Sequence, residues 1–421
     1  MSKILVYTSP ARGHLYPLVP TLQELRRRGH DVAVWTMAAE VDRVRALGLT
    51  ANAIDPAIEA REIDDWKASS PPAALLAASR TFIDRGRHEV GDLRRAIERE
   101  QPDLLFTDVN SWGAAAAAEA SGLPWAVFAP YFLPMQAPGA PPWGLGLAPF
   151  GGVLGRIRDA VLWWVVNKLY DRALPGVNEL RATVGVEPFR HVADFAKRPP
   201  RVVSYTAEPF EYPRIWPANV CLVGPGVWEP EAGPTRSGPC DKRPLVLVTC
   251  STEYQNDGRL VETALAALAD EPVRVVATTA SIDPASFRAP ANARVERFVP
   301  HGPLLRDAAC VVCHGGMGIT QKALAAGVPV CVVPFGRDQL EVARHVTVAN
   351  AGTQLAPKRL SPDRLRRAIH EAIARKPGAL RVAEGFRRAG SATVAADVVE
   401  GLRAGAQHGA RRASRDGDAH P

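Results

Sequence analysis

The sequence has few cysteines and no recognisable set of metal ligands. Six cysteines occur among 421 residues, at positions 221, 240, 250, 310, 313 and 331, and their spacing forms no disulfide framework. At least three lie in apolar, strand-like runs, where cysteine behaves as a small hydrophobic residue. Cys310-Val-Val-Cys313-His314 has the pattern of c-type haem attachment, but both cysteines lie in a β-branched run without an export signal. No second Cys/His pair has zinc-site spacing, so we expect neither disulfides nor a bound metal.

Long apolar runs are also absent. The most apolar short run, residues 160–166, is too short to span a bilayer. The first ten residues, MSKILVYTSP, lack the apolar core and cleavage site of a signal peptide. We therefore expect a cytoplasmic protein that makes no membrane contact. The net charge of +7 is not gathered into Lys/Arg blocks with interleaved aromatic residues, which argues against nucleic-acid binding. A nucleotide diphosphate would be a sufficient acidic ligand.

The common nucleotide-binding fingerprints are missing as well. The loop SPARGHLYP at residues 9–17 contains one glycine, whereas G-x-G-x-x-G would mark a dinucleotide site. There is no G-x-x-x-x-G-K-[ST] phosphate loop. No Asp-x-Asp pair ends a strand, which argues against a Mg²⁺-dependent transferase of the other major transferase fold. An NAD-type oxidoreductase on doubly wound domains stays an alternative, disfavoured by the missing fingerprint.

Apolar strands alternate with helices in both halves of the chain. A chain of 421 residues is too long for one ordinary core and predicts two domains. The alternation predicts parallel sheets with crossover helices, an α/β class. Helices are expected over 17–28, with Pro17 in the first turn, and over 73–99 and 153–180. The expected strands are 4–8, 31–36, 49–54, 103–108, 125–129, 202–205 and 221–224, followed by 245–250, 273–278, 293–297, 308–313 and 330–333.

Composition divides the chain at a linker. Residues 229–243 are rich in Pro, Gly and Ser, which places an N-terminal domain at 1–228 and a C-terminal domain at 244–385. We expect a C-terminal helix over 386–404 that returns to the first domain. The remaining residues, 405–421, are mainly Gly, Ala, Arg, Ser and Asp and predict a disordered tail.

Residues 298–339 hold the densest group of candidate site residues. An apolar strand leads into a glycine-rich turn at His314, a helix at 319–326, a second strand, and a polar turn with Asp338 and Gln339. Glycines at 315, 316 and 318 let a phosphate approach the backbone, and the helix presents its free N–H groups and positive dipole end. His314 adds a hydrogen-bond donor. The segment predicts a diphosphate site that works without metal; a plain tight turn is the alternative.

The ordered motifs F-x-P-H, H-G-G-x-G, G-V-P and P-x-x-x-D-Q resemble the donor-binding signature of family 1 GT-B glycosyltransferases. The segment is most similar to bacterial members that attach deoxysugars to antibiotics, including the enediyne-tailoring enzymes. The resemblance implies two facing, doubly wound Rossmann-like domains with a cleft between them. It implies an inverting, metal-independent and cofactor-free transfer of a deoxysugar from a TDP-sugar to a hydroxyl of an aromatic or polyketide-type natural product. The expected partners are the nucleotide sugar and a hydrophobic small molecule, with a homodimer left open.

Two polar residues follow apolar strands of the first domain and resemble the catalytic dyad of this family. They are His14, after the first strand, and Asp108, at the end of the strand PDLLFTD. An alcohol needs a base, histidine titrates near neutrality, and a carboxylate fixes its tautomer. The alternatives are a surface histidine and an aspartate that caps the next helix. A catalytically silent partner protein of the same fold is the other functional alternative, and the intact pair argues against it.

The resemblance also implies roles in donor binding. The backbone of Val299 would contact the nucleobase, and Phe298 or a neighbour would stack on it. Asp338 and Gln339 would read sugar hydroxyls, although Asp338 and Glu341 also have the spacing of a capping box. The residues expected around the diphosphate are Ser251, Thr252, His314, Gly315, Gly316, Met317 and Gly318.

One position departs from the family pattern. Many relatives carry a glutamate eight residues after the phosphate-binding histidine, where it binds both ribose hydroxyls. Here that position is Lys322. Because a deoxyribose lacks the 2′-hydroxyl, the change favours a TDP-linked donor over a UDP-linked one. The alternative is that Lys322 is a solvated helix residue that points away.

Aromatic residues crowd the Pro/Gly-rich region 131–150 and the helix after it. Such residues suit a flat, hydrophobic acceptor, and we expect the acceptor to contact Tyr131, Phe132, Trp143 and Trp163. Ordinary core packing is the alternative, favoured for at least one residue of the pair Trp163 and Trp164. The run Asp64-Asp65-Trp66 could lie at the edge of the same cleft, but a solvated loop is the preferred interpretation.

Overall fold

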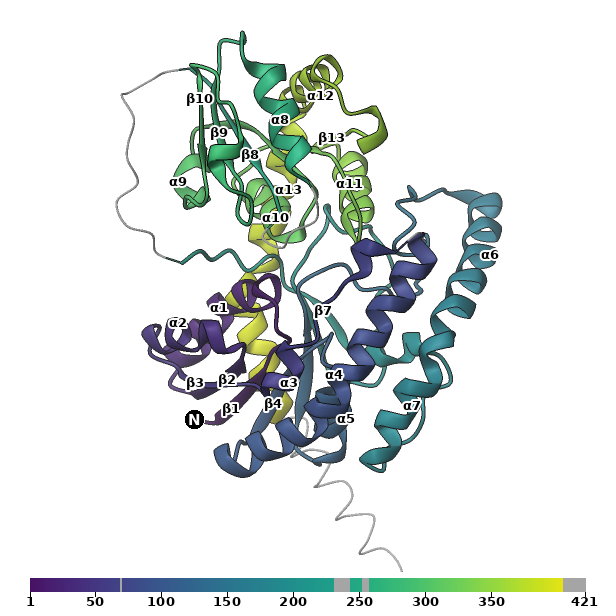
Figure 1. Cartoon of the computed structure of the whole chain (residues 1–421). Helices are drawn as coiled ribbons and strands as arrows, with labels where there is room; N and C mark the ends of the chain where they lie inside the picture. The colour runs from purple at the N-terminus through teal and green to yellow at the C-terminus, as the bar shows by residue number, and fades with distance from the viewer. Residues whose placement is uncertain (69, 231–242, 252–256, 404–421) are drawn as a thin grey trace, which may run out of the picture.

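The computed structural model describes residues 1–68, 70–230, 243–251 and 257–403. It contains two parallel sheets, one above the other in Figure 1. The first has the strand order β3-β2-β1-β4-β5-β6-β7 and the second the order β10-β9-β8-β11-β12-β13. In both sheets the chain first adds two strands on one side of its first strand, and then returns to place its fourth strand on the other side. This is the arrangement of doubly wound folds, in which ligands bind at the point where the strand order changes side. The predicted α/β class with two doubly wound sheets is confirmed.

The strands lie close to the predicted runs because buried parallel strands are continuous apolar segments. In the first sheet they are β1 (Lys3–Tyr7), β2 (Asp31–Thr36), β3 (Thr50–Ala53), β4 (Leu104–Asp108), β5 (Trp125–Ala129), β6 (Val202–Ser204) and β7 (Val220–Leu222). In the second they are β8 (Leu245–Thr249), β9 (Arg274–Thr278), β10 (Ala293–Glu296), β11 (Ala308–Cys313), β12 (Val330–Val332) and β13 (Gly352–Gln354).

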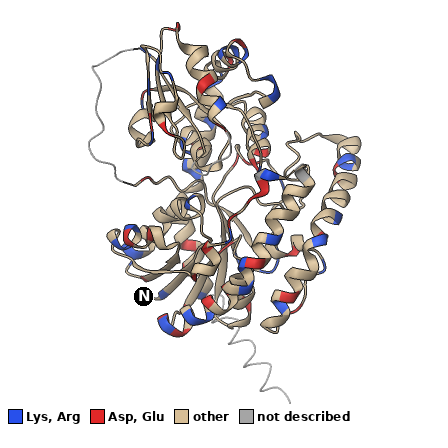
Figure 2. Ribbon diagram, in the orientation of Figure 1, with Lys and Arg blue, Asp and Glu red and all other residues tan. Residues whose placement is uncertain are grey.

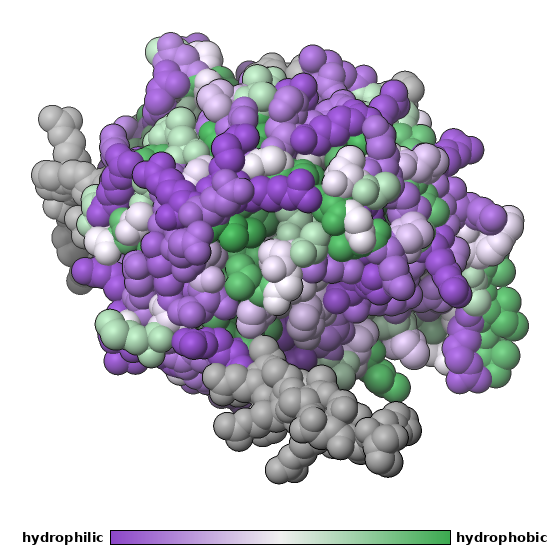
Figure 3. Space-filling view, turned by 90° about the horizontal axis from the view of Figure 1, so that it is seen from below, coloured by the Kyte–Doolittle hydropathy of each residue, from purple (hydrophilic) through white to green (hydrophobic). Residues whose placement is uncertain are grey.

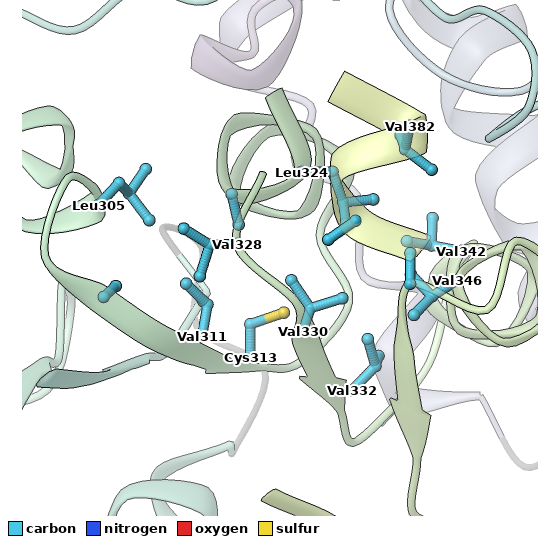
Figure 4. Packing of buried hydrophobic residues seen from close by; sticks show 14 of the residues in the cluster. Leu305, Val311, Cys313, Leu324, Val328, Val330, Val332, Val342, Val346 and Val382 are labelled. Carbon is cyan, nitrogen blue, oxygen red and sulfur yellow. The ribbon is translucent and has the colours of Figure 1, made fainter. Parts of the chain in front are cut away.

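Helices cover both faces of each sheet. On the N-terminal domain they are α1 (Arg12–Arg27), α2 (Val41–Ala46), α3 (Pro56–Glu59), α4 (Pro71–Glu100), α5 (Trp112–Ala120), α6 (Gly152–Tyr170) and α7 (Leu174–Thr183). On the C-terminal domain they are α8 (Gly258–Leu268), α9 (His301–Leu305), α10 (Met317–Ala325), α11 (Gln339–Val348), α12 (Pro362–Ala374) and α13 (Lys376–Ala389). Figure 4 shows Leu324 of α10, Val342 of α11 and Val382 of α13 packed against β11 and β12.

Two helix predictions were wrong. Helix α1 begins at Arg12, so Pro17 lies inside it and not in its first turn. A proline there removes one helical hydrogen bond, but Leu15, Leu18 and Leu22 are buried and keep the helix on the sheet. The helix predicted over 153–180 is divided into α6 and α7 by a single 3₁₀ turn, because the proline at position 175 fits only the first turn of a new helix.

The chain returns to the first domain at its C-terminal end. Residues 391–403 are helical, and Ala395, Ala396 and Val399 pack in the same core as β1 and α1. Asp397 and Glu400 accept hydrogen bonds from Arg28 of α1, at 2.6 and 2.8 Å. The domain boundaries at 228 and 243 stay predictions, since most of the linker and the tail 405–421 lie outside the described residues.

Charge and hydropathy are distributed unevenly over the surface. Figure 2 shows basic and acidic residues scattered over the helices of both domains, with the strands mostly uncharged. Seen from below, the N-terminal domain is largely hydrophilic, with an apolar region at the right edge, the side where Figure 1 places α6 and α7 (Figure 3). Helix α6 exposes Leu154, Ile157, Val161 and Trp164. Within the described chain, no helix combines the length and apolarity that a bilayer span requires.

Candidate active site

His14 and Asp108 meet at the carboxyl ends of two neighbouring strands. His14 lies in the first turn of α1, directly after β1, and Asp108 ends β4, which pairs with β1. His14 Nδ1 is 2.9 Å from each carboxylate oxygen of Asp108. Burial by itself would raise the pKa of Asp108, but His14 and the surrounding hydrogen bonds outweigh burial and lower it. The carboxylate stays ionised, so it accepts a hydrogen bond from Nδ1–H of His14.

Besides His14, several hydrogen-bond donors contact the carboxylate of Asp108. Ser9 donates to Oδ2 from its backbone N–H at 3.1 Å and its hydroxyl at 2.8 Å, and the Asn110 N–H donates to Oδ1 at 2.8 Å. Asp108 is not the cap of α5. The first N–H groups of that helix, at Gly113 and Ala114, donate instead to Glu89 Oε2 from helix α4. Burial raises the pKa of Glu89 to about 8. Nothing in the local sequence marks Glu89, because it lies 24 residues before the helix that it caps.

Asn110 faces the other nitrogen of the histidine ring and was missed by the sequence analysis. Its Nδ2 lies 3.4 Å from His14 Nε2, and the Tyr131 hydroxyl donates to its Oδ1 at 2.7 Å. The Tyr131 ring centre is 5.7 Å from that of His14 and 6.5 Å from that of Trp143. Of the four predicted acceptor residues, Tyr131 therefore lies next to the dyad, and Trp143 lies next to Tyr131.

The other two predicted acceptor residues lie deeper. Phe132 is buried and stacks on His345 of α11, with ring centres 3.7 Å apart. Trp163 is also buried, and its indole N–H donates to the Ala140 carbonyl at 3.3 Å. Trp164 is the exposed member of its pair. Phe132 and Trp163 thus support the Pro/Gly-rich loop from beneath.

Of the three glycines predicted to leave the backbone open to a phosphate, only Gly318 has open space beside it. Gly315 has φ +96°, and a Cβ there would lie 2.7 Å from Val332 Cγ1, so the turn needs glycine. A Cβ at Gly316 would collide with the His314 ring, whereas one at Gly318 would meet nothing within 4 Å. Helix α10 begins at Met317 without a side-chain cap. Free N–H groups at a helix start, with open space beside them, are an arrangement that can bind an anion.

His314 lies beneath this turn as a neutral ring. Burial lowers its pKa to about 4. Its Nδ1 is buried without a hydrogen-bond partner among the described residues, and lies 4.0 Å from Asp257 Oδ2. Asp257 accepts the Ser251 N–H at 2.6 Å, which places Ser251 beside His314. Thr252 lies outside the described residues.

Asp338 and Gln339 lie at the start of α11, but not as a capping box. Asp338 makes no side-chain cap, and Glu341 Oε2 turns to the other domain, where it accepts the N–H groups of Gly144 and Gly146 at 3.1 and 3.0 Å. Burial raises the pKa of the Asp338 carboxyl, and the charges of Arg337 and His14 act against that rise. Asp338 therefore lies within electrostatic range of the dyad. Gln339 Oε1 closes the preceding turn by accepting the N–H of Phe335 at 2.7 Å.

The following turns of α11 hold the N-terminal domain in place. The Arg344 Nε donates to the Gly146 carbonyl at 2.8 Å. His345 stacks between Phe132 and Tyr212, whose ring centres are 3.7 and 3.6 Å away, and its Nδ1 contacts the Phe210 carbonyl at 2.8 Å. Together with Glu341, these residues form an interdomain clamp on the loop that carries Trp143.

A further interdomain contact corrects the interpretation of residues 64–66. Asp65 is not a solvated loop residue, because its carboxylate pairs with Arg337 Nε at 3.2 Å. Arg337 directly precedes Asp338, so this ion pair joins the two domains beside Asp338. A charge run between two helices gives no sign of a partner 272 residues away.

The Val299 region meets the start of the linker. Val299 is buried, while Phe298 is 55% exposed. Glu229 accepts the N–H groups of His301 and Gly302 at 3.0 and 2.8 Å and pairs with Lys322 at 2.7 Å. Lys322 is therefore not a solvated residue that points away, and its side chain is 18% exposed.

Comparisons with known proteins agree with this architecture. Residues 262–401 match the family model described as erythromycin biosynthesis protein CIII-like, C-terminal domain. The chain is 34% identical to 4'-demethylrebeccamycin synthase of Lentzea aerocolonigenes, over 95% of this chain and 99% of that protein. It is 25% identical to demethyllactenocin mycarosyltransferase of Streptomyces fradiae, over 96% of this chain and 87% of that protein.

Solved structures share the whole fold. CalG4, the calicheamicin glycosyltransferase, superposes with a TM-score of 0.73 at 21% identity, covering 96% of this chain and 98% of that one. The glycosyltransferase VinC, solved with dTDP, superposes with a TM-score of 0.68 at 23% identity, covering 96% and 100%. CalG4 bears out the expected likeness to enediyne-tailoring enzymes at the level of the fold. With a relative 34% identical over nearly its full length, the chain belongs to the GT-B glycosyltransferases of antibiotic pathways.

Proposed function

We propose that this glycosyltransferase moves a deoxysugar from a TDP-sugar to a hydroxyl of a hydrophobic, aromatic or polyketide-type acceptor, with inversion and without a metal ion. The observation that carries the proposal is the pair His14–Asp108, joined at 2.9 Å at the carboxyl ends of β1 and β4. A buried, ionised carboxylate on Nδ1 is the arrangement that prepares Nε2 to accept a proton.

The bonds change as follows. His14 Nε2 takes the proton of the acceptor hydroxyl while its oxygen bonds to the anomeric carbon of the sugar. The bond from that carbon to the diphosphate oxygen breaks, and TDP leaves with the electron pair. One displacement inverts the anomeric configuration. Asp108 stabilises the imidazolium that forms, and the proton passes to solvent afterwards.

The departing diphosphate would be met by the glycine-rich turn. Helix α10 begins without a side-chain cap, so its first N–H groups are free to donate, and a Cβ at Gly318 would meet no protein atom within 4 Å. Among the described residues there is no group of three or more His, Cys, Asp or Glu that could hold a metal. Helix N-terminal donors bind phosphate directly, which supports a metal-independent departure.

Acceptor and nucleotide preferences rest on separate observations. Tyr131 and Trp143 line the approach to His14 with aromatic surface, which suits a flat apolar acceptor. The similar glycosyltransferase VinC was solved with dTDP. We therefore propose TDP-linked donors.

Product analysis tests this proposal. Purified enzyme is incubated with TDP- and UDP-sugars and a panel of aromatic and polyketide acceptors, with and without EDTA. We expect a TDP-dependent O-glycoside of inverted anomeric configuration by NMR, formed equally with EDTA. A product of retained configuration, or activity lost on chelation and restored by Mg²⁺, would contradict the proposed chemistry.

A further inference from the structure

The His14 nitrogen that does not face Asp108, Nε2, makes a contact that the proposed mechanism does not use. Asn110 Nδ2 lies 3.4 Å from His14 Nε2. The Tyr131 hydroxyl donates to Asn110 Oδ1 at 2.7 Å, and this bond sets the amide orientation with its NH₂ group toward the histidine. Because Nδ1–H is committed to Asp108, Nε2 presents a lone pair, which is what an amide NH₂ group needs as its acceptor.

From this chain of contacts we infer that Asn110 is a positioning residue for the base, oriented by Tyr131. It holds the neutral His14 tautomer with a free Nε2 lone pair, and it occupies the place of the acceptor hydroxyl until the acceptor binds. The inference rests on the proposed role of His14 as the base.

The contacts on the two sides of the His14 ring differ in length. The Asp108 contacts at 2.9 Å have ordinary hydrogen-bond length, whereas 3.4 Å to Asn110 is at the long end. A long, weak contact is readily exchanged for the acceptor hydroxyl, which makes a shorter bond to the same lone pair. Asn110 thus orients the ring without blocking the proton transfer.

The amide also affects the charge state of the base. Once Nε2 is protonated, its N–H would face the amide NH₂ group, donor against donor. Two carboxylates act in the opposite sense, since Asp108 on β4 and Asp338 before α11 both favour the imidazolium. Tyr131 stays a neutral donor, because burial raises its pKa well above its ordinary value. An Asn110 amide that donates to Nε2 therefore fits a His14 ring whose Nε2 carries no proton.

The pH dependence of kcat/KM tests the inference. Asn110→Asp is nearly isosteric and places another carboxylate beside Nε2. We expect it to move the acid limb of the profile upward by about one pH unit or more, so that kcat/KM below that limb falls roughly tenfold or more. Tyr131→Phe, which frees the amide to rotate, shifts the limb by less in the same direction. Ser111→Ala is the matched control, because its buried hydroxyl has no partner among the described residues; its profile overlays the wild type.

A second readout needs no substrate. In protein labelled with ¹⁵N-histidine, with the His14 signals assigned by their loss in His14→Gln, Nδ1 should be protonated and Nε2 free at pH 8. In Asn110→Asp both nitrogens should stay protonated to higher pH. Unchanged pH profiles and histidine shifts in Asn110→Asp and Tyr131→Phe, with transfer abolished in His14→Ala, would overturn the inference and leave the proposed function standing. Retained transfer in His14→Ala would overturn both. If Asn110→Asp does not fold, Tyr131→Phe decides by the same two measurements.

Discussion

Lys322 Nζ lies 2.7 Å from Glu229 Oε1, and this pair joins the nucleotide-binding domain to the first residues of the linker. Burial by itself would raise the pKa of Glu229, but the charge of Lys322 and the hydrogen bonds from Lys322 and Gly302 together hold it below its ordinary value. The same carboxylate accepts the N–H groups of His301 and Gly302. Position 322 therefore acts through Glu229 and not as an isolated ribose contact.

Lys322→Glu is expected to lower stability without converting the enzyme to UDP preference. The new carboxylate would face Glu229, and loss of a charged hydrogen bond costs about 1.5–3 kcal/mol. Chemical denaturation should show a loss of that order, and calorimetry should show weaker binding of TDP and UDP alike. The double variant Lys322→Glu, Glu229→Lys should recover part of the loss. A stable Lys322→Glu variant that prefers UDP would instead indicate that residue 322 contacts the ribose directly.

Stability should fall as the pH is lowered from about 6.5 to about 4. His301 and His314 are both held neutral, because burial lowers each pKa to about 4. In that interval the unfolded chain binds protons that the folded chain does not, so unfolding becomes easier as the pH falls. Each histidine contributes a slope of up to about 1.4 kcal/mol per pH unit. Urea unfolding at pH 7 and pH 5 should show a smaller difference for His314→Gln than for the wild type; equal differences would contradict the assignment.

Glu341→Gln is expected to weaken acceptor binding while leaving donor binding intact. The carboxylate oxygen Oε2 of Glu341 accepts both N–H groups, and the neutral amide oxygen of glutamine would make weaker hydrogen bonds to them. The loop with Trp143 should loosen, raising the acceptor KM on the order of tenfold, the cost of about one hydrogen bond. Glu384→Gln, on the surface of α13, is the control. A rise in the dissociation constant of TDP with an unchanged acceptor KM would contradict the clamp.

Alanine substitutions at two glycines of the glycine-rich turn should have different effects. Gly315→Ala must place a Cβ at φ +96°, 2.7 Å from Val332 Cγ1, so it should lower the melting temperature by several degrees. Gly318→Ala meets no protein atom within 4 Å, so its melting temperature should match the wild type. Its Cβ would enter the proposed phosphate site, and TDP affinity should fall tenfold or more by calorimetry. If Gly318→Ala binds TDP with wild-type affinity, the diphosphate does not bind beside Gly318.

The sequence predicts best where the physics is local. β5 and β11 run over the predicted residues because continuous apolar runs have few alternatives, and His14 and Asp108 meet because neighbouring parallel strands end at one edge. Glu341 shows the limit. Its spacing from Asp338 fits a capping box, and only the folded chain shows that the Gly144 and Gly146 N–H groups compete for it.

Partners far apart in the sequence account for the other misses. Glu229 with Lys322, Asp65 with Arg337 and Asn110 with His14 are separated by 93, 272 and 96 residues. Each residue is ordinary in its local sequence, and its role arises only from packing. The roles assigned to the donor and acceptor residues remain predictions.

The measurement that tests the account most directly is transfer by His14→Ala beside a matched histidine control. His191 also pairs with a carboxylate, Asp171, at 2.8 Å, but lies exposed and away from the cleft. We expect His14→Ala to lower kcat/KM by about a hundredfold or more, with TDP binding within about twofold of the wild type, because His14 acts on the acceptor. His191→Ala should match the wild type in both. Transfer by His14→Ala within a few-fold of the wild type would contradict the central claim that the His14–Asp108 pair is the base.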